Sequence, residues 1–341
     1  FVTGGSNANL VAVLAALNKY IPNYKDDGLY KIGKKPIMII SDEAHYSYEK
    51  AALISGLGVN SVRYVDTDVT GSINIKNLKD TIESINPDKE LLFFIGLTAG
   101  TTVKGAYDPI KDIIDLYKDK YWIHVDGSWG GPVIFSKKYK FLVDGISKVD
   151  SFSFDAHKMI GAQLICSVIL FRDCDILCNL NSNNPAEYLF HDNKEVEYNL
   201  GNYSLQCGRR VEALKLWLIW STLGTNGLDK EITTLYDRAK DVYKYINKSP
   251  YLELACELSS VNICFRYYNS LFDNEQLNEI NIKLRNKLRD SGEFFTNYSN
   301  IGGLIFFRII IVNSSLTVSG TSPSNSLQIC SEASFRYLAL R

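Results

Sequence analysis

The sequence predicts an α/β fold in which a large domain, built on a mainly parallel sheet, is followed by a small α+β domain. Two patterns support this. Between residues 8 and 172, short β-rich runs alternate with helical patterns, and such alternation is typical of βαβ units with parallel strands. From about residue 250, two strand-like runs flank one helix. We therefore expect a large domain at 1–249 and a small C-terminal domain at 250–341.

The helices and strands of the large domain follow from the spacing of apolar residues. Helical spacing predicts helices over 8–17, 75–85 and 109–117. The last begins at Pro109, and proline is favoured at the start of a helix because its missing N–H would have no partner there. The short β-rich runs predict strands. These runs are 37–41, 61–65, 91–98, 121–126 and 151–154.

Glycines mark the ends of the later helices. A helix over 211–223 ends at Gly224 and one over 276–290 ends at Gly292, where glycine is a common C-terminal cap. The remaining predicted elements are a helix over 229–247 and strands over 261–268 and 304–312. Residues 179–199 are Asn-rich and aperiodic, which predicts a long loop or lid. No element is predicted for 314–341.

Composition excludes several classes of protein. The chain has 341 residues, 46% of them hydrophobic and 22% charged, as in ordinary globular proteins. Lys and Arg total 37 against 38 Asp and Glu, which leaves no basic surface for nucleic acid. The longest apolar runs, 91–95 and 309–312, are far shorter than the roughly 20 residues that cross a bilayer. We therefore expect neither a nucleic-acid nor a membrane partner.

The cysteines indicate the cellular compartment of the protein, and the first residue indicates whether another segment precedes the sequence. The chain holds an odd number of cysteines and no Cys-x-x-Cys pair, which favours reduced thiols in the cytoplasm and no metal site. The cysteines are 166, 174, 178, 207, 256, 264 and 330. The chain begins at Phe1 inside a motif and shows no targeting segment, so we expect an N-terminal portion to precede it.

Several polar side chains lie where a parallel sheet would bind a ligand, near the carboxyl ends of strands. Gly5 and Ser6 form a small-residue turn before a helix, which suits phosphate but also an ordinary helix cap. Asp126 ends a strand, as a ligand partner or as a cap for the next turn. Lys158 follows His157 after another strand, either as an exposed pair or as an amine for Schiff-base chemistry.

Five segments, in this order, resemble the group II pyridoxal-phosphate-dependent amino-acid decarboxylases. They are Thr-Gly-Gly-Ser-Asn-Ala-Asn-Leu at 3–10, Ser-Asp-Glu-Ala-His-Tyr-Ser at 41–47, Thr-Ala-Gly-Thr-Thr-Val-Lys-Gly-Ala-Tyr-Asp at 98–108, His-Val-Asp-Gly-Ser-Trp-Gly-Gly at 124–131 and Asp-Ala-His-Lys at 155–158. The resemblance runs from residue 1 to about 313. It implies pyridoxal-phosphate fold type I, the fold of aspartate aminotransferase.

The resemblance also implies a cofactor, pyridoxal 5'-phosphate, and a role for each matched residue. Lys158 would hold the cofactor covalently, Asp126 would pair with its protonated ring nitrogen, and the imidazole of His45 would stack on the ring. Without the family, His45 would be a local hydrogen bonder. The other residues that the resemblance places at the cofactor are Gly5, Ser6, Thr98, Ser128 and His157.

Two further residues point to decarboxylation. Tyr188 resembles the family's tyrosine that protonates the substrate carbon after carbon dioxide leaves, although an aromatic residue could equally anchor the loop. Arg308 interrupts an apolar strand and resembles the arginine that binds the substrate carboxylate, because a guanidinium forms two parallel hydrogen bonds with a carboxylate.

The chain departs from the family at several places. Gly127-Ser128 stands where members commonly have Ala-Ala, and Asp155-Ala156 where they often have Asn-Pro. An acid beside a phosphate should weaken its binding unless the acid is paired. The sequence opens at the turn at 3–10, where we expect the family's N-terminal segment to precede it, and a Ser-rich tail follows residue 313.

The resemblance implies a homodimeric enzyme that releases carbon dioxide from a small-molecule amino acid, and from the cysteines we expect it to be cytoplasmic. Segments 187–190 and 203–217 look most like the glutamate and cysteine-sulfinate branch, so we expect glutamate, cysteine sulfinate or aspartate as the substrate. One alternative is an aromatic-amino-acid decarboxylase. Another is a catalytically poor fragment or partner subunit that binds the cofactor without turnover.

Overall fold

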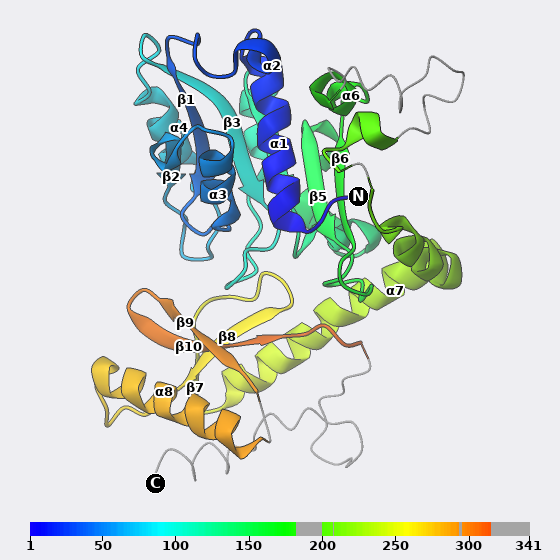
Figure 1. Ribbon diagram of the computed structural model, residues 1–341. Coiled ribbons are helices and arrows are strands. Elements are labelled where there is room, and N and C mark those ends of the chain that lie inside the picture. Colours follow the sequence, from blue (N-terminus) through cyan, green and yellow to red (C-terminus); the bar gives the residue numbers. More distant parts are fainter. Residues whose placement is uncertain (182–199, 207, 293–294, 315–341) are drawn as a thin grey trace.

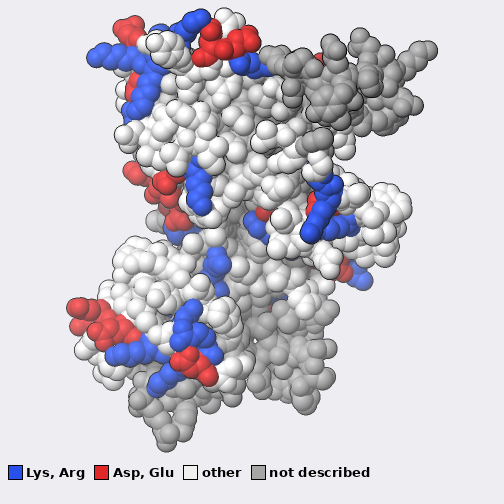
Figure 2. All heavy atoms as spheres, viewed as in Figure 1, with Lys and Arg blue, Asp and Glu red and all other residues white. Residues whose placement is uncertain are grey.

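A computed structural model describes residues 1–181, 200–206, 208–292 and 295–314 of the chain, and the rest lies outside the description. Figure 1 shows two sheets, a large one wrapped by helices and a smaller one below it. The long helix α7 (Glu212–Lys248) runs from the large sheet toward the small one. Figure 2 shows basic and acidic side chains intermixed on this face of the molecule.

The large sheet has six strands in the order β2-β1-β3-β4-β5-β6. All neighbouring strands pair in parallel except β6, which pairs antiparallel with β5. The strands are β1 Lys35–Ser41, β2 Val62–Val65, β3 Glu90–Thr98, β4 Trp122–Asp126, β5 Ser151–Asp155 and β6 Ser167–Phe171. This arrangement confirms the predicted α/β class with a mainly parallel sheet.

Both faces of the large sheet are buried, as parallel sheets require. Along β1, Met38 and Ile40 face a core that includes residues of α1 and α3. Ile37 and Ile39 face the opposite core, which also holds residues of α4 and α5 and continues through α7 to the small sheet. The helices of this part are α1 Gly5–Tyr20, α2 Tyr24–Asp27, α3 Ser47–Ile54, α4 Ile75–Glu83, α5 Ile110–Tyr117 and α6 Ile176–Asn181. Short 3-10 turns span Val59–Ser61, Gly131–Phe135, Lys140–Val143, Ile146–Lys148 and Leu200–Tyr203.

The small sheet is antiparallel, with the order β7-β8-β10-β9. Its strands are β7 Leu252–Leu254, β8 Asn262–Tyr267, β9 Asn297–Ile301 and β10 Leu304–Ile310. The helix α8 (Asn274–Ser291) begins at a capping box made by Asp273 and Gln276. It ends at Gly292, whose φ of 72° is the left-handed conformation expected of a glycine cap.

The predicted elements of the large sheet are present, with ends displaced by at most three residues. Three strands, β6, β7 and β9, were not predicted. β7 has only three residues and β9 is polar, whereas β6 was missed although its sequence is apolar. The helices predicted over 211–223 and 229–247 meet in α7 at Gly224, whose φ of 64° and ψ of 174° break the helical path. The second helix resumes at once rather than at 229.

The parallel strands bring several polar residues to one edge. β1, β3, β4 and β5 point the same way, so their carboxyl ends lie side by side, and the start of α1 lies at that edge. Thr98 pairs with Asp126 across β3 and β4, and Asp126 pairs with Ser153 across β4 and β5. Among the described residues, no helix combines the length and apolar character needed to span a membrane.

Candidate active site

A cavity of about 300 Å³ opens at the carboxyl edge of the large sheet. Every residue that the sequence predicted at the cofactor lines it. These residues are Gly5, Ser6, His45, Thr98, Asp126, Ser128, His157 and Lys158. Thr3, Gly4, Tyr46, Gly100, Thr102, Trp129 and Asp155 complete the lining. Segments up to 155 residues apart in the sequence therefore share one cavity.

The cavity wall at the start of α1 has room only for glycine. Gly4 precedes the helix with φ 122°, and no side chain caps the helix start. A Cβ on Gly5 would lie 2.1 Å from Ser128 Oγ, so any other residue would displace that side chain. The first N–H groups of a helix have no partner within it. This corner can therefore accept an anion against backbone N–H groups and the positive end of α1.

Asp126 is a buried carboxylate that the fold keeps ionised. Its Oδ2 accepts a hydrogen bond of 2.7 Å from Asn9 Nδ2, and its Oδ1 accepts one of 2.9 Å from the backbone N–H of Ser128. Burial alone would raise the pKa of Asp126, but the hydrogen bonds from Asn9 and Ser128 hold that pKa below its ordinary value of 3.8. An ionised carboxylate in this position suits a cationic partner.

Lys158 lies in the turn that follows β5. Its amine is 2.8 Å from Asp155 Oδ2, and Asp155 Oδ1 accepts a hydrogen bond of 2.6 Å from Ser167 Oγ. His157 Nε2 lies 3.7 Å from the same carboxylate. Asp155 is 2% exposed while Lys158 is 36% exposed. The unusual acid noted in the sequence is therefore paired, and the lysine is held at the cavity wall.

His45 lies close enough to Asp126 and Lys158 for their charges to affect its pKa. Its Nδ1 is 2.8 Å from Ser47 Oγ, at the start of α3. Burial lowers the pKa of His45, while the charges of Asp126 and Lys158 act on it in opposite directions. A pKa below the ordinary value leaves this imidazole mainly neutral near pH 7.

Arg308 lies beside the cavity rather than in its lining. Its Nη1 donates a 2.5 Å hydrogen bond to the carbonyl oxygen of Thr102, a lining residue. The expected substrate contact at Arg308 thus stays a prediction. Tyr188 falls outside the described residues, and its predicted role also stays a prediction.

Sequence reasoning missed two asparagines that organise this site. Asn9 is fully buried and holds Asp126. Asn262, in β8, donates to the carbonyls of Thr101, Thr102 and Val103 and accepts 2.7 Å from the indole N–H of Trp129. Asn9 could have been noticed as a polar residue on the apolar face of a predicted helix. Asn262 carried no comparable signal.

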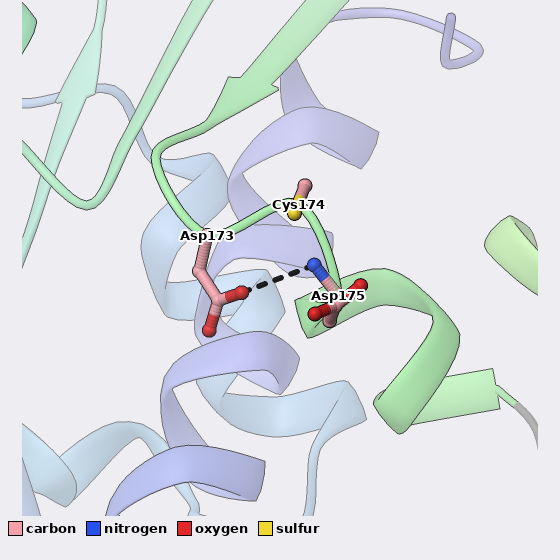
Figure 3. Close-up of side chains that lie close together, drawn as sticks. All are labelled: Asp173, Cys174 and Asp175. Atoms are coloured by element: carbon pink, nitrogen blue, oxygen red, sulfur yellow. Dashed lines mark hydrogen bonds between the residues drawn. The ribbon is translucent and has the colours of Figure 1, made fainter.

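An exposed cluster of side chains that could bind a metal ion lies outside the cavity. Asp173, Cys174 and Asp175 lie close together in the turn between β6 and α6 (Figure 3). Asp173 accepts a 3.0 Å hydrogen bond from the backbone N–H of Asp175, which explains the cluster as a turn. Within the described part of the chain, five cysteines carry free thiols. They are Cys166, Cys174, Cys178, Cys256 and Cys264.

The polar groups that line the cavity fit one kind of ligand. The α1 corner suits a phosphate, Asp126 suits a cationic ring nitrogen, and the amine of Lys158 can condense with an aldehyde. Thr98 Oγ1 is buried and has no hydrogen-bond partner among the described residues, so it has a free donor for a guest in the cavity. Together these groups fit pyridoxal 5'-phosphate.

Comparison with known proteins agrees with this chemistry. Residues 1–268 match the pyridoxal-dependent decarboxylase conserved domain. The chain is 34% identical over 325 residues to an acidic amino acid decarboxylase, GADL1, of Xenopus tropicalis, covering 92% of this chain and 63% of that protein. It is 34% identical over 330 residues to the cysteine sulfinic acid decarboxylase of Homo sapiens, covering 93% and 66%.

A solved structure has the same fold. The apo form of mouse CSAD superposes with a TM-score of 0.88 at 30% identity, covering all of this chain and 70% of that one. The chain spans a little under two thirds of the length of the curated relatives described above. By the extent of the matched domain and the likeness of its relatives, the chain belongs to the pyridoxal-dependent decarboxylase family.

Proposed function

We propose that this chain carries the active site of a pyridoxal-phosphate-dependent enzyme that removes the α-carboxyl group of an L-amino acid as carbon dioxide and yields an amine. The observation that carries the proposal is that the amine of Lys158 and the ionised carboxylate of Asp126 line one cavity. Asp126 ends β4 and Lys158 follows β5, the next strand of the sequence, and the parallel pairing of the two strands brings both groups to one edge of the sheet.

Each residue predicted at the cofactor has a proposed task. Lys158 would hold the cofactor covalently, and Asp126 would keep a proton on the ring nitrogen. Gly5 and Ser6 would bind the phosphate at the start of α1. His45 would pack against the ring. Thr98, Ser128 and His157 would contact the cofactor's remaining edges. When bound, the cofactor supplies an electron sink for the charge left by a departing carboxyl group.

The charges and the shape of the cavity are already in place before a ligand binds. Asp126 is ionised by its hydrogen bonds and buried away from water, which makes its charge effective. Asp155 accepts a hydrogen bond from the Lys158 ammonium and fixes the direction of that side chain. The small volume of about 300 Å³ limits the water that can share the cavity with a bound molecule.

We further propose an acidic substrate, such as glutamate, cysteine sulfinate or aspartate. The support is the resemblance of segments 187–190 and 203–217 to the branch that acts on such acids, and the names of the relatives compared above. Arg308, which borders the cavity through Thr102, would bind a substrate carboxylate. Tyr188 would return a proton to the substrate carbon.

The decisive experiment measures carbon dioxide release from a panel of acidic and aromatic L-amino acids in the presence of the cofactor. We expect release from at least one acidic substrate and none from tyrosine or DOPA. Lys158→Ala should abolish release and the visible absorbance of the bound cofactor, whereas the exposed Lys79→Ala should retain both. Carbon dioxide release from tyrosine or DOPA alone would contradict the proposal that the substrate is acidic.

The same measurements separate turnover from mere binding. A cofactor absorbance band that forms on Lys158 but does not shift when amino acids are added would support the catalytically poor alternative. A covalent adduct that persists in Lys158→Ala would show that another lysine holds the cofactor.

We also propose a cytoplasmic homodimer, with residues 1–249 and 250–341 as its large and small domains. The free thiols support a reducing compartment. A dimer is supported by an exposed apolar face on the first half of α7, since exposed apolar patches commonly mark protein interfaces. Its members are Leu214, Trp217, Leu218, Trp220 and Leu223.

A further inference from the structure

A buried chain of side chains runs behind the cavity from Trp122 to His45. It begins where Trp122 Nε1 donates 2.9 Å to Ser151 Oγ, which lies 2.8 Å from His124 Nδ1. His124 Nε2 lies 3.0 Å from Asn9 Oδ1. Trp122, Ser151, His124 and Asn9 are each at most 1% exposed, so water takes no part in these bonds.

At Asn9 the chain divides into two branches that both reach the cavity. Asn9 Nδ2 donates 2.7 Å to Asp126 Oδ2 and 2.8 Å to Ser47 Oγ. Ser47 Oγ lies 2.8 Å from His45 Nδ1. Asp126 and His45 line the cavity, whereas Asn9 and Ser47 do not.

The first donor fixes the direction of the bonds as far as Asn9. An indole N–H can only donate, so Ser151 Oγ accepts from Trp122 and its own proton goes to His124 Nδ1. A neutral His124 then carries its proton on Nε2 and donates to Asn9 Oδ1. Burial lowers the pKa of His124, which keeps this imidazole neutral.

The same logic continues through both branches. The Asn9 oxygen is engaged by His124, so its two N–H groups face Asp126 and Ser47. Ser47 Oγ accepts from Asn9, and the Ser47 backbone N–H donates 3.3 Å to His45 Nδ1. His45 Nδ1 is therefore an acceptor, and the Ser47 hydroxyl proton goes to it as well. His45 must then carry its own proton on Nε2, since a neutral imidazole has one donor and one acceptor.

The reverse orientation of the Asn9 amide has clear consequences. Its oxygen would stand 2.7 Å from the Asp126 oxygen, which is tolerable only if Asp126 is protonated. Its nitrogen would face His124 Nε2 and force the His124 proton onto Nδ1. Ser151 would then meet two donors, and its own proton would have no acceptor among the hydrogen bonds of the described residues.

We propose that Asn9 is a positioning residue that locks Asp126 as an ionised acceptor and His45 as the Nε2–H tautomer in a single proton arrangement. The proposal rests on the proposed function, because it sets the state in which both residues meet the cofactor. His124 and Ser47 are the two supports through which Asn9 acts. Neither Asn9 nor His124 touches the cavity, so the effect is on orientation and proton placement.

The test reads the tautomers directly, in protein without cofactor, from the imidazole ¹⁵N shifts. The chain has 4 histidines, which single His→Gln variants assign. We expect His124 and His45 both to be neutral at pH 7 with the proton on Nε2. A proton on His124 Nδ1 would overturn the proposal. The measurement does not depend on turnover, so it stands whether or not the chain decarboxylates amino acids.

Two variants test the branches separately. Ser47→Ala should leave His45 Nδ1 with only the 3.3 Å bond from the backbone N–H of residue 47 and so shift part of the His45 proton from Nε2 to Nδ1, while His124 keeps its Nε2 proton. Asn9→Leu should loosen the His45 tautomer, while the bonds from Trp122 and Ser151 keep the His124 proton on Nε2. With cofactor and substrate, Asn9→Leu should lower kcat about 10- to 100-fold, the range for losing an outer hydrogen-bond partner, with little change in KM. The control is Asn281→Leu, which removes another fully buried asparagine far from the cavity.

An unchanged His45 spectrum in Asn9→Leu would contradict the proposal. A fall in kcat equal to that of Asn281→Leu would likewise assign the loss to stability rather than to positioning. Should Asn9→Leu fail to fold, the wild-type spectrum and Ser47→Ala still decide, because Ser47 sits on the branch to His45 alone.

Discussion

At the scale of single residues, Asp155, which stands where the sequence pattern often has asparagine, is one of the best paired groups in the site. Its carboxylate binds Lys158 and Ser167. Asp155 Oδ2 also lies 3.2 Å from where a Cβ on Gly5 would stand, close to the corner proposed for the phosphate. The pair with Lys158 offsets the charge of Asp155 only while that amine remains an ammonium.

Asp155→Asn should therefore strengthen cofactor binding. Removing one negative charge beside a phosphate should lower the Kd for pyridoxal 5'-phosphate about tenfold, or roughly 1.4 kcal/mol. A titration followed by absorbance measures this Kd. Asp173→Asn, in an exposed turn, is the control and should leave the Kd unchanged. Weaker binding by Asp155→Asn would mean that orienting Lys158 matters more than the charge.

Asp108 makes folding stability depend on pH. It accepts hydrogen bonds from the backbone N–H groups of Ile73 and Thr98, yet burial raises the pKa of Asp108 to about 7. The folded state thus binds more protons than the unfolded state between about pH 4 and 7. Stability from this group is complete below that range and is lost as pH rises through it.

Asp108→Asn should remove this slope. Relative to wild type, the free energy of unfolding of the variant should improve by roughly 2–4 kcal/mol between pH 4 and pH 7. Urea unfolding at a series of pH values measures the difference. Asp80→Asn, at an exposed position, should run parallel to wild type. A constant gap between Asp108→Asn and wild type would show that Asp108 does not titrate in this range.

His124 contributes a slope of the opposite sign. Burial lowers its pKa, so the unfolded state binds more protons as the pH falls below about 6.5. Stability from His124 is therefore present at high pH and lost in acid. Asp108 and His124 change the free energy of unfolding in opposite directions as the pH falls. Their contributions partly cancel in the pH dependence of the wild-type protein, so comparing each variant with wild type separates them.

At the scale of helices and strands, the sequence located the elements whose apolar pattern is strong. The parallel strands β1, β3 and β4 and the helix α5 were predicted within two residues of their observed ends. β9, with the sequence Asn-Tyr-Ser-Asn-Ile, has no apolar alternation, and it forms because β10 pairs with it. Pairing of this kind is set by tertiary contacts, which a single sequence does not report.

Asn262 joins the two sheets at the cavity. From β8 it donates to three successive carbonyls of the loop at 101–103 and accepts from Trp129. Trp129 and Thr102 line the cavity. This buried side chain therefore holds part of the cavity wall against the small sheet.

Asn262→Ala should weaken both stability and substrate binding. Losing a buried amide that satisfies several backbone groups should cost about 1–3 kcal/mol of unfolding free energy. KM should rise because Thr102 and Trp129 are released. Chemical denaturation and steady-state kinetics measure the two effects. Asn247→Ala, exposed near the end of α7, should change neither. A stability loss with an unchanged KM would make Asn262 structural only.

At the scale of the whole molecule, the sequence predicted the residues proposed to bear the chemistry, which line one cavity, but not the residues that hold them. Lys158, Asp126 and His45 lie in recognisable segments, and each carries a reactive or charged group. Asn9 contacts Ser47 at a separation of 38 residues, and His124 and Asp126 at separations of more than 100 residues. Neutral hydrogen bonders of this kind have no signature outside the folded chain.

The exposed face of α7 leads to a prediction about assembly. Leu214, Trp217 and Leu218 follow helical spacing, and Trp217 is 61% exposed. Such an apolar stripe is costly to leave in water, and a second copy of the chain could cover it symmetrically. A charge placed in the centre of that contact would be buried without a partner.

Trp217→Glu should therefore shift the proposed dimer toward monomer, because an unpaired buried carboxylate would cost several kcal/mol of association energy. Light scattering coupled to gel filtration measures the mass of each species. Val69→Glu is the control, since Val69 is 88% exposed in a turn away from α7, and it should leave the dimer intact. A dimer that survives Trp217→Glu would place the contact on another face, and a monomeric wild-type protein would contradict the homodimer itself.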